Sequence, residues 1–223
     1  SVYDPAATAD TVNPGNKIIY LTFDDGPGKY TQGLLDLLDK YNVKVTFFVT
    51  NTHPDYQNLI AEEAKRGHTV AIHSASHKYN QIYTSEQAYF DDLEQMNSII
   101  KAQTGNDASI IRFPGGSSNT VSKDYCPGIM TQLVNDVTAR GLLYCDWNVS
   151  SGDANNKPIS TEQVVQNVIS GVQSHNVSVV LQHDIKDFSV NAVEQIIQWG
   201  QANGYTFLPL TTSSPMSHHR VNN

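Results

Sequence analysis

Positive charge is scarce in this sequence. Lysine and arginine together number 14, against 22 aspartate and glutamate residues, and the formal net charge is −8. A chain with this balance and no basic run is a poor partner for a nucleic-acid backbone or for an anionic membrane surface, because both need clustered positive charge. We therefore expect no nucleic-acid partner.

Long apolar runs are absent too. No segment reaches the roughly 18 consecutive apolar residues of a membrane-spanning helix, and no charged-then-apolar leader opens the chain. We expect neither membrane insertion nor a signal peptide in this chain. The polar start, residues 1–16, is expected to be an N-terminal arm or a linker remnant.

Cysteine is the third scarcity. Cys126 and Cys145 are the two cysteines of the chain. Two cysteines are too few for a disulfide framework, and their separation does not match the short CxxC spacing of a zinc or redox pair. We expect both to be free thiols.

What the sequence has is a regular alternation of short β-branched runs and amphipathic helical patterns. Such alternation implies parallel strands joined by crossover helices, since parallel neighbours cannot be linked by a tight hairpin. The length of 223 residues suits one domain, either a closed or slightly open barrel or a doubly wound sheet. The expected strands are residues 17–23, 43–49, 68–72, 109–113, 142–147, 177–183 and 205–210.

Helix boundaries are also marked in the sequence. Apolar residues recur at spacings of three and four before Tyr41 and after Tyr89, as an amphipathic helix requires. Thr84 and Ser160, each followed three residues later by glutamine, resemble capping boxes and predict helix starts.

Polar side chains follow most of the expected strands. In both architectures the ligand lies at the carboxyl ends of the strands, so residues distant in sequence converge at one rim. The distribution therefore predicts an active site there, although His53 receives no role. In chain order these residues are Asp24 and Asp25, His53, His73 and His77, Arg112, Asp146 and Trp147, and His183 and Asp184.

Asp24 and Asp25 are adjacent carboxylates at a strand end. A turn before Gly-Pro explains one aspartate but explains two poorly, because neighbouring carboxylates repel each other. A division of labour removes the conflict if one carboxylate binds a cation and the other accepts a proton from water. His73 and His77 are four residues apart, a spacing that places two imidazoles on one side of a metal; such pairs also occur incidentally, but a nearby carboxylate favours a catalytic metal site.

Arg112, Asp146 and His183 have ordinary alternatives when taken singly. Arg112 suits a surface ion pair, Asp146 a turn or a helix dipole, and His183 a hydrogen-bonded core position. On a shared rim, Arg112 would hold the second aspartate ionised. A nearby Asp146 would favour the charged form of His183 and supply a general acid.

Five segments carry most of these residues: TFDDGPG (22–28), HSASH (73–77), RFPGG (112–116), DWNVSSGD (146–153) and LQHD (181–184). In this order they resemble the motifs of the polysaccharide deacetylases, carbohydrate esterase family 4, over residues 17–210. The resemblance implies an α/β fold, a deformed (β/α) barrel of about seven parallel strands with outer helices in a single domain. It places the catalytic domain at residues 17–212 and a C-terminal tail at 213–223.

The resemblance also implies roles for individual residues. The family commonly has an aromatic residue at the position of Gly115, whose backbone N–H is an oxyanion donor, so we expect the donor to remain while one wall of the sugar groove is missing. The implied metal is zinc, or another divalent transition metal. By similarity Asp25, His73 and His77 bind the metal, Asp24 is the general base, Arg112 orients Asp24, His183 is the general acid, Asp146 tunes His183, and Trp147 and Leu181 form apolar walls of the acetyl pocket.

The implied reaction is removal of N-acetyl groups from amino sugars of a polysaccharide, peptidoglycan or a chitin-like polymer of N-acetylglucosamine, with release of acetate. The alternatives are an O-deacetylase of acetylated xylan and a non-catalytic carbohydrate-binding pseudoenzyme. A degenerate copy is expected to lose a ligand, the acid or the base, whereas all are present. The substrate class implies an extracellular or cell-wall location, and no obligate protein partner is evident.

Overall fold

The computed structural model describes residues 15–223, so nearly all of the predicted N-terminal arm lies outside the described residues. Its strands are β1 (Ile18–Asp24), β2 (Thr46–Thr50), β3 (Thr69–Ser74), β4 (Ile110–Ile111), β5 (Leu143–Tyr144), β6 (Val149–Ser150), β7 (Val177–His183) and β8 (Thr206–Phe207). Its α-helices are α2 (Thr31–Tyr41), α3 (Leu59–Lys65), α4 (Tyr79–Ile82), α5 (Glu86–Thr104), α6 (Ile129–Ala139), α7 (Thr161–Gln173), α8 (Asp187–Val190) and α9 (Val193–Ala202). Two short 3-10 helices, η2 (Pro54–Tyr56) and η3 (Val121–Asp124), complete the elements.

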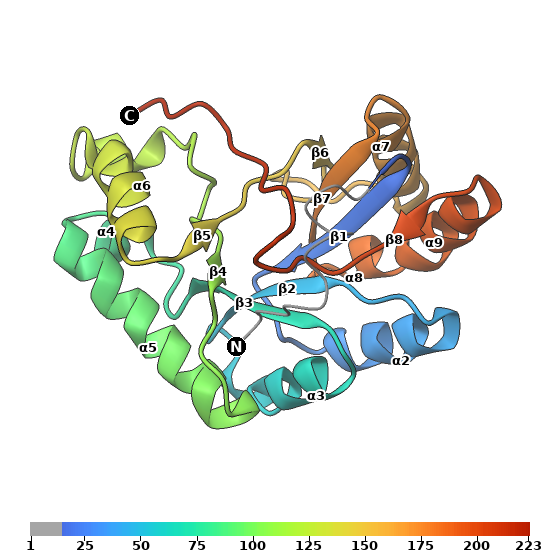
Figure 1. Cartoon of the computed structure of the whole chain (residues 1–223), viewed down its shortest axis with the longest axis horizontal. Helices are drawn as coiled ribbons and strands as arrows, with labels where there is room; N and C mark the ends of the chain where they lie inside the picture. Colours follow the sequence, from blue (N-terminus) through green and yellow to red (C-terminus); the bar gives the residue numbers. More distant parts are fainter. Residues whose placement is uncertain (1–14) are drawn as a thin grey trace.

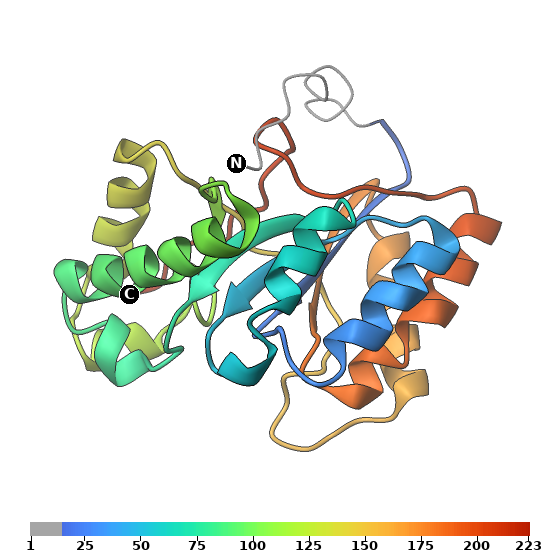
Figure 2. The same ribbon diagram turned by 90° about the horizontal axis from the view of Figure 1, so that it is seen from below.

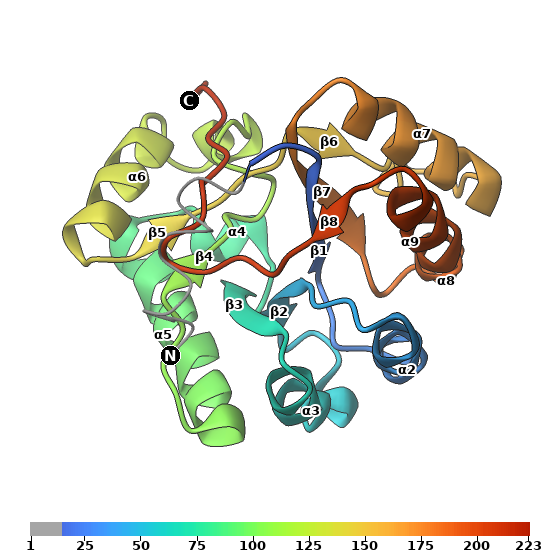
Figure 3. The same ribbon diagram turned by 45° about the vertical axis from the view of Figure 1, so that its right-hand side comes forward.

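All strand pairs in the sheet are parallel. The seven strands of the main path lie in the order β5-β4-β3-β2-β1-β7-β6, and β8 pairs with β1 outside this path. The strands curl into an arc with the longer helices on its outer side (Figures 1 and 3). The predicted deformed (β/α) barrel in a single domain is confirmed, and the doubly wound alternative is not observed.

Helices α2, α3 and α5 run side by side along the outer face of the sheet, as Figure 2 shows from below. The sheet side chains that meet these helices come from alternate strand positions, since successive residues of a strand point to opposite faces. On β1 these are Ile19, Leu21 and Phe23, all essentially buried in the larger apolar core. This outer core explains why the helices are amphipathic.

The other face of β1 points into the barrel. Ile18 and Tyr20 belong to a smaller apolar cluster there. Strand alternation continues with Thr22 and Asp24, so the carboxylate of Asp24 reaches the barrel interior at the carboxyl end of the strand. In the β1–β7 register Asp24 is the partner of His183, which brings these two residues to the same level of the sheet.

Two smaller predictions are tested here. Cys126 and Cys145 are both free, as expected. None of the helices among residues 15–223 combines the length and the apolar character that crossing a membrane requires.

Candidate active site

One pocket of about 320 Å³ collects most of the predicted site residues. Arg112 and Asp146 are fully buried behind its wall. Tyr79 and Ala154 line the pocket too, although the sequence analysis did not single them out. The predicted residues that line it are Asp24, Asp25, His73, His77, Gly115, Trp147, Leu181 and His183.

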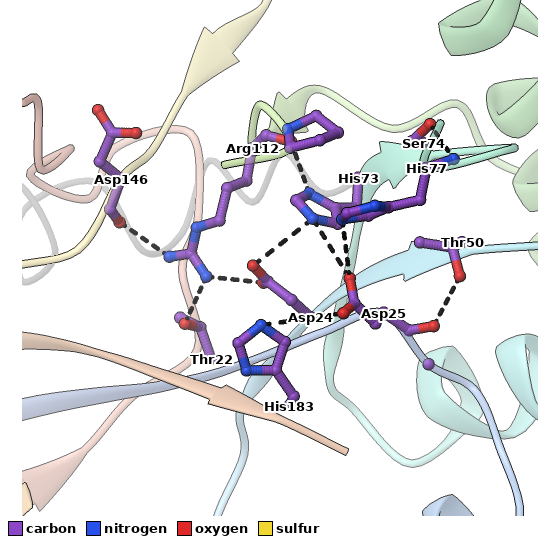
Figure 4. A network of polar contacts seen from close by, with 12 residues as sticks. Thr22, Asp24, Asp25, Thr50, His73, Ser74, His77, Arg112, Asp146 and His183 are labelled. Carbon is purple, nitrogen blue, oxygen red and sulfur yellow. Dashed lines mark hydrogen bonds and ion pairs between the residues drawn. The ribbon is translucent and has the colours of Figure 1, made fainter. Parts of the chain in front are cut away.

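Asp25, His73 and His77 form a triangle whose ligand atoms all lie within 4.8 Å of one another. The Nε2 atoms of His73 and His77 are each 3.4 Å from Asp25 Oδ1 (Figure 4). Asp25 Oδ1 is buried and has no hydrogen-bond partner among the described residues, which is costly for a carboxylate oxygen unless a cation satisfies it. The residues present therefore fit a divalent metal ion.

The chain fixes the geometry of this triangle. His73 Nδ1 lies 2.7 Å from the carbonyl oxygen of Arg112, which can only accept, so Nδ1 carries the proton and Nε2 keeps a lone pair for a ligand. Burial lowers the pKa of His73, which favours the neutral form that binds metal. Asp25 and His77 have φ values of 80° and 52°, a left-handed conformation that is uncommon outside glycine and is concentrated at functional sites.

The charge on Asp25 is kept by its surroundings. Burial acts to raise the pKa of this carboxyl group, but the neighbouring His183, His73 and His77 outweigh it, and the pKa lies below its usual value. An ionised carboxylate is the form that binds a divalent cation.

Arg112 holds Asp24 from behind the pocket. The guanidinium group donates from Nη1 to Asp24 Oδ1 at 2.8 Å and to Thr22 Oγ1 at 2.7 Å. Two further donors reach main-chain carbonyl oxygens, those of Cys145 at 2.9 Å and Asp146 at 2.8 Å. Four of the five guanidinium N–H donors are thus used, and the second oxygen of Asp24 is left facing the triangle, 3.7 Å from His73 Nε2.

His183 lies on the other side of the triangle, with its Nε2 3.9 Å from Asp25 Oδ2. Its Nδ1 donates to Asp153 Oδ1 at 2.8 Å. The other oxygen of Asp153 accepts from the backbone N–H of His183 at 2.7 Å and from Ser189 Oγ at 2.6 Å. Burial lowers the pKa of His183, but the hydrogen bond and charge of Asp153, with smaller contributions from the two aspartates of β1, raise it to about 9.

The predicted pairing of Asp146 with His183 is therefore wrong. The carboxylate of Asp146 accepts from the backbone N–H and hydroxyl of Ser117 and from the backbone N–H of His219. Figure 4 shows this carboxylate pointing away from His183, with only the main-chain carbonyl of Asp146 turned to Arg112. Asp146 anchors the loop after β4, and Asp153 is the partner of His183.

The order of the strands in the sheet explains why Asp153, and not Asp146, pairs with His183. Asp146 follows β5, at the end of the sheet beside β4. Three residues later the chain enters β6, which pairs with β7 at the opposite end of the path and delivers Asp153 beside His183. The sequence does contain the correct partner, as the second aspartate of the motif DWNVSSGD. The strand between the two aspartates, β6, is only two residues long, however, and so short a strand has no periodicity by which it could be predicted.

The loop after β4 shapes one end of the pocket. Gly115 has a φ of 80°, and its N–H has no hydrogen-bond partner among the described residues. A Cβ atom on Gly116 would lie 2.8 Å from the indole of Trp147, so only glycine lets Trp147 pack on this loop. Leu181, almost buried on β7, faces the same pocket.

The groove wall expected to be missing beside Gly115 is replaced from another element. The phenolic oxygen of Tyr79, on α4, lies 3.3 Å from the position that a Cβ atom of Gly115 would take. Tyr79 lines the pocket, and its ring packs on His77 at a centroid distance of 5.6 Å and on Tyr83 at 6.0 Å.

The C-terminal segment contacts this site as well. His219 donates its backbone N–H to Asp146 at 2.9 Å, and its ring lies 4.6 Å from that of Trp147 in an edge-on arrangement. His218 stacks on Tyr144 at a centroid distance of 3.8 Å. Neither histidine joins the Asp25, His73 and His77 triangle.

Comparison with known proteins agrees with this geometry. The family described as Polysaccharide deacetylase matches residues 11–126. A solved structure, the catalytic domain of peptidoglycan N-acetylglucosamine deacetylase from Eubacterium rectale, is 97% identical, with a TM-score of 0.95 over 99% of this chain and 100% of that one. A peptidoglycan-N-acetylglucosamine deacetylase of Bacillus cereus is 33% identical over 196 residues, which are 86% of this chain and 68% of the relative. A bifunctional xylanase/deacetylase of Pseudobutyrivibrio xylanivorans is 31% identical over 205 residues, and the match spans 90% of this chain but 31% of that protein. The chain therefore belongs to the polysaccharide deacetylase family, carbohydrate esterase family 4.

Proposed function

We propose that this chain is a metal-dependent hydrolase that removes N-acetyl groups from N-acetylglucosamine units of a polysaccharide and releases acetate. The observation that carries the proposal is a single pocket in which Asp24 and His183 face the same metal-ligand triangle. One is a carboxylate held by an arginine, and the other is a histidine with a raised pKa. Amide hydrolysis requires such a pair, a base for water and an acid for the leaving nitrogen.

Asp25, His73 and His77 would hold the metal. Zinc is our first choice, because two histidines and a carboxylate with open positions form a catalytic zinc site, and another divalent transition metal could use the same ligands. When bound, the metal supplies a Lewis acid that polarises the acetyl carbonyl and lowers the pKa of water.

Asp24 accepts the proton of the attacking water. The accepting atom is Oδ2, because Oδ1 is engaged by Arg112 Nη1. The same contact keeps Asp24 in one orientation, so Arg112 acts by positioning the base. The proton transfer leaves the water oxygen free to attack the acetyl carbon.

His183 donates a proton to the departing nitrogen. The donating atom is Nε2, because the Nδ1 proton is held by Asp153 and Nε2 points to the triangle. Without this proton an amide anion would have to leave, which is very unfavourable. The raised pKa supplies the protonated form at neutral pH.

Three further residues receive the acetyl group. The unpartnered N–H of Gly115 donates to the developing oxyanion, while Trp147 and Leu181 give the methyl group an apolar surface and exclude water.

Peptidoglycan is the polymer that we place first. The 97% identical solved structure is described as a peptidoglycan N-acetylglucosamine deacetylase, and a peptidoglycan substrate would place the enzyme at the cell wall, outside the membrane. An O-deacetylase of acetylated xylan is the second candidate, because the bifunctional xylanase/deacetylase is 31% identical to this chain.

Acetate release from three polymers separates these functions. The metal-loaded protein is incubated with peptidoglycan, with N-acetylglucosamine oligomers and with acetylated xylan, and acetate is measured. We expect release from the first two and little from xylan. His183→Ala sharpens the assay, because loss of the acid should slow amide cleavage far more than ester cleavage. Release from acetylated xylan alone would overturn the N-deacetylase assignment.

A further inference from the structure

A second cavity lies beside the catalytic pocket and has no role in the mechanism above. Its volume is about 220 Å³. It is formed by the turns after β1, β2 and β7; the first of these turns carries Asp25, and the last begins directly after His183. The residues that line it are Gly28, Lys29, Tyr30, His53, Tyr56 and Ile185.

Direct contacts join this cavity to the catalytic rim. Thr52 Oγ1 lies 3.0 Å from His53 Nδ1 and 3.4 Å from the carbonyl oxygen of Asp25. Ile185 Cγ2 lies 3.3 Å from the position that a Cβ atom of Gly28 would take, so the turns after β1 and β7 are in close contact here. The cavity is therefore built from the turns that follow β1, β2 and β7, next in sequence to Asp25 and His183.

The lining combines aromatic surface with a few polar tips. Tyr30 and Tyr56 offer rings, Ile185 adds an aliphatic surface, and Lys29 and His53 supply polar nitrogens. None of the six lining residues is acidic. Flat rings beside a small number of hydrogen-bonding groups suit a pyranose, whose C–H face packs on an aromatic ring while its hydroxyl groups bond to polar atoms.

Tyr56 is an exposed aromatic side chain of this surface. Its exposed fraction is 37%, and among residues 15–223 only Tyr125, at 42%, is also a large hydrophobic residue with this degree of exposure. Tyr56 lies on the short helix after β2 and lines the cavity, whereas Tyr125 lines neither this cavity nor the catalytic pocket.

We propose that this cavity is a glycan subsite, which binds one pyranose ring of the polysaccharide chain whose acetylated sugar occupies the catalytic pocket. The class of ligand, a glycan, rests on the proposed function. Because the cavity lies next to the catalytic rim, a neighbouring sugar of the same polysaccharide chain is the ligand that we expect in it. The subsite also gives His53 a place, as a polar group that meets sugar hydroxyl groups at the rim.

Equilibrium binding tests the subsite separately from catalysis. The metal-loaded protein carrying Asp24→Asn, which prevents turnover during the titration, is titrated calorimetrically with β-1,4-linked N-acetylglucosamine tetramer and with the monomer. Adding Tyr56→Ala should weaken tetramer binding by about 2- to 10-fold, the range for loss of one aromatic contact, and leave monomer binding unchanged. Tyr56→Phe should bind the tetramer as the parent does, and Tyr125→Ala is the matched control.

The outcomes distinguish the two proposals. Equal tetramer affinities in the parent and in Tyr56→Ala, or no preference for tetramer over monomer in the parent, would overturn the subsite even if acetate is released. An equal loss in Tyr125→Ala would also overturn it. Tetramer binding that depends on Tyr56, in a protein that releases no acetate from any glycan, would keep the subsite and remove the proposed deacetylase function.

Discussion

Asp24 is 3% exposed, and one of its oxygens is already committed to Arg112. Replacement by asparagine keeps the shape and a hydrogen-bonding oxygen but removes the basic carboxylate. We expect Asp24→Asn to lower acetate release by about 10²- to 10⁴-fold, the usual contribution of a positioned base. Metal content, measured in the same preparation, should stay at the parent level because Asp24 is outside the ligand triangle.

His73→Ala is the contrasting variant. It removes one of the three ligands, so both acetate release and metal content should fall. Equal acetate release by Asp24→Asn and the parent would rule out the base assignment, and full metal content in His73→Ala would rule out the ligand assignment.

The pH profile should report the pairing of His183 with Asp153. The raised pKa of His183, about 9, means that the protonated acid is present below this pH and is lost as the pH rises through it. Replacing Asp153 by asparagine removes the anion that stabilises the imidazolium, so the pKa of His183 should fall. The alkaline limb of the kcat/KM profile should therefore move to lower pH in Asp153→Asn.

Asp146→Asn is the matched control for that shift. Its carboxylate bonds to Ser117 and His219 and not to His183, so it should change the height of the profile without moving the alkaline limb. If the alkaline limb moved in Asp146→Asn but stayed in place in Asp153→Asn, Asp146 and not Asp153 would be the partner of His183.

Glu63, on α3, has both carboxylate oxygens buried without a hydrogen-bond partner among the described residues. Burial, with a contribution from Asp184, raises the pKa of Glu63 well above its usual value. The unfolded chain releases this proton near pH 4.3, so the folded state loses stability as the pH rises above that value toward the raised pKa, by at most about 1.4 kcal/mol per pH unit.

Glutamine at position 63 cannot ionise and should escape this loss. We expect the free energy of unfolding of Glu63→Gln, measured with urea, to exceed that of the parent by an amount that grows between about pH 4 and pH 8. Glu62→Gln, on the surface beside Arg66, is the control and should show no such growth. A difference that stays constant with pH would contradict the explanation.

At the scale of elements, strand-end residues were predictable but their partners were not. The expected strand 177–183 coincides with β7, since a long β-branched run is visible in the sequence. Ser160 does cap α7, whereas the cap of α5 is Ser85 and not Thr84, because capping signals are ambiguous when two hydroxyl residues are adjacent. Which aspartate pairs with His183 depends on the order of strands in the sheet. Because the short strand β6 was not predicted, the sequence pointed to the wrong aspartate.

The C-terminal segment is an element that the sequence left without a role, and its contacts predict a measurable contribution. The imidazole of His219 packs edge-on against the ring of Trp147, and its Nε2 lies 2.6 Å from the carbonyl oxygen of Trp147, so this side chain supports one wall of the pocket. We expect His219→Ala to lower the free energy of unfolding by about 0.5 to 2 kcal/mol and to raise KM for the glycan, because Trp147 becomes less well held. Chemical denaturation and steady-state kinetics measure the two effects.

Arg220→Ala is the control for this variant. Arg220 is exposed and adjacent in sequence, so neither quantity should change by more than the ordinary surface effect. Identical KM values for His219→Ala and the parent would show that the segment does not support the pocket.

At the scale of the whole molecule, the metal-ligand triangle and the apolar core occupy different places. All seven residues of β1 are buried, and the core beneath the helices is assembled from alternate strand residues. The triangle lies at the carboxyl ends of β1 and β3 (Figure 4), and none of its three residues belongs to this core. The fold should therefore survive removal of the metal, in contrast to small domains whose folding depends on it.

Chelation tests this separation of fold and chemistry. We expect a chelator to abolish acetate release while the far-ultraviolet circular dichroism of the protein is unchanged at room temperature. The melting temperature should fall, because a metal that binds only the folded state stabilises it by about 2.7 kcal/mol at a free concentration 100 times its Kd. His73→Ala should melt at the same temperature with and without metal, since its site is broken. Unfolding on chelation, together with no hydrolysis of any acetylated glycan, would instead identify a structural metal in a carbohydrate-binding domain without catalysis, since the metal would then be supporting the core and not the reaction.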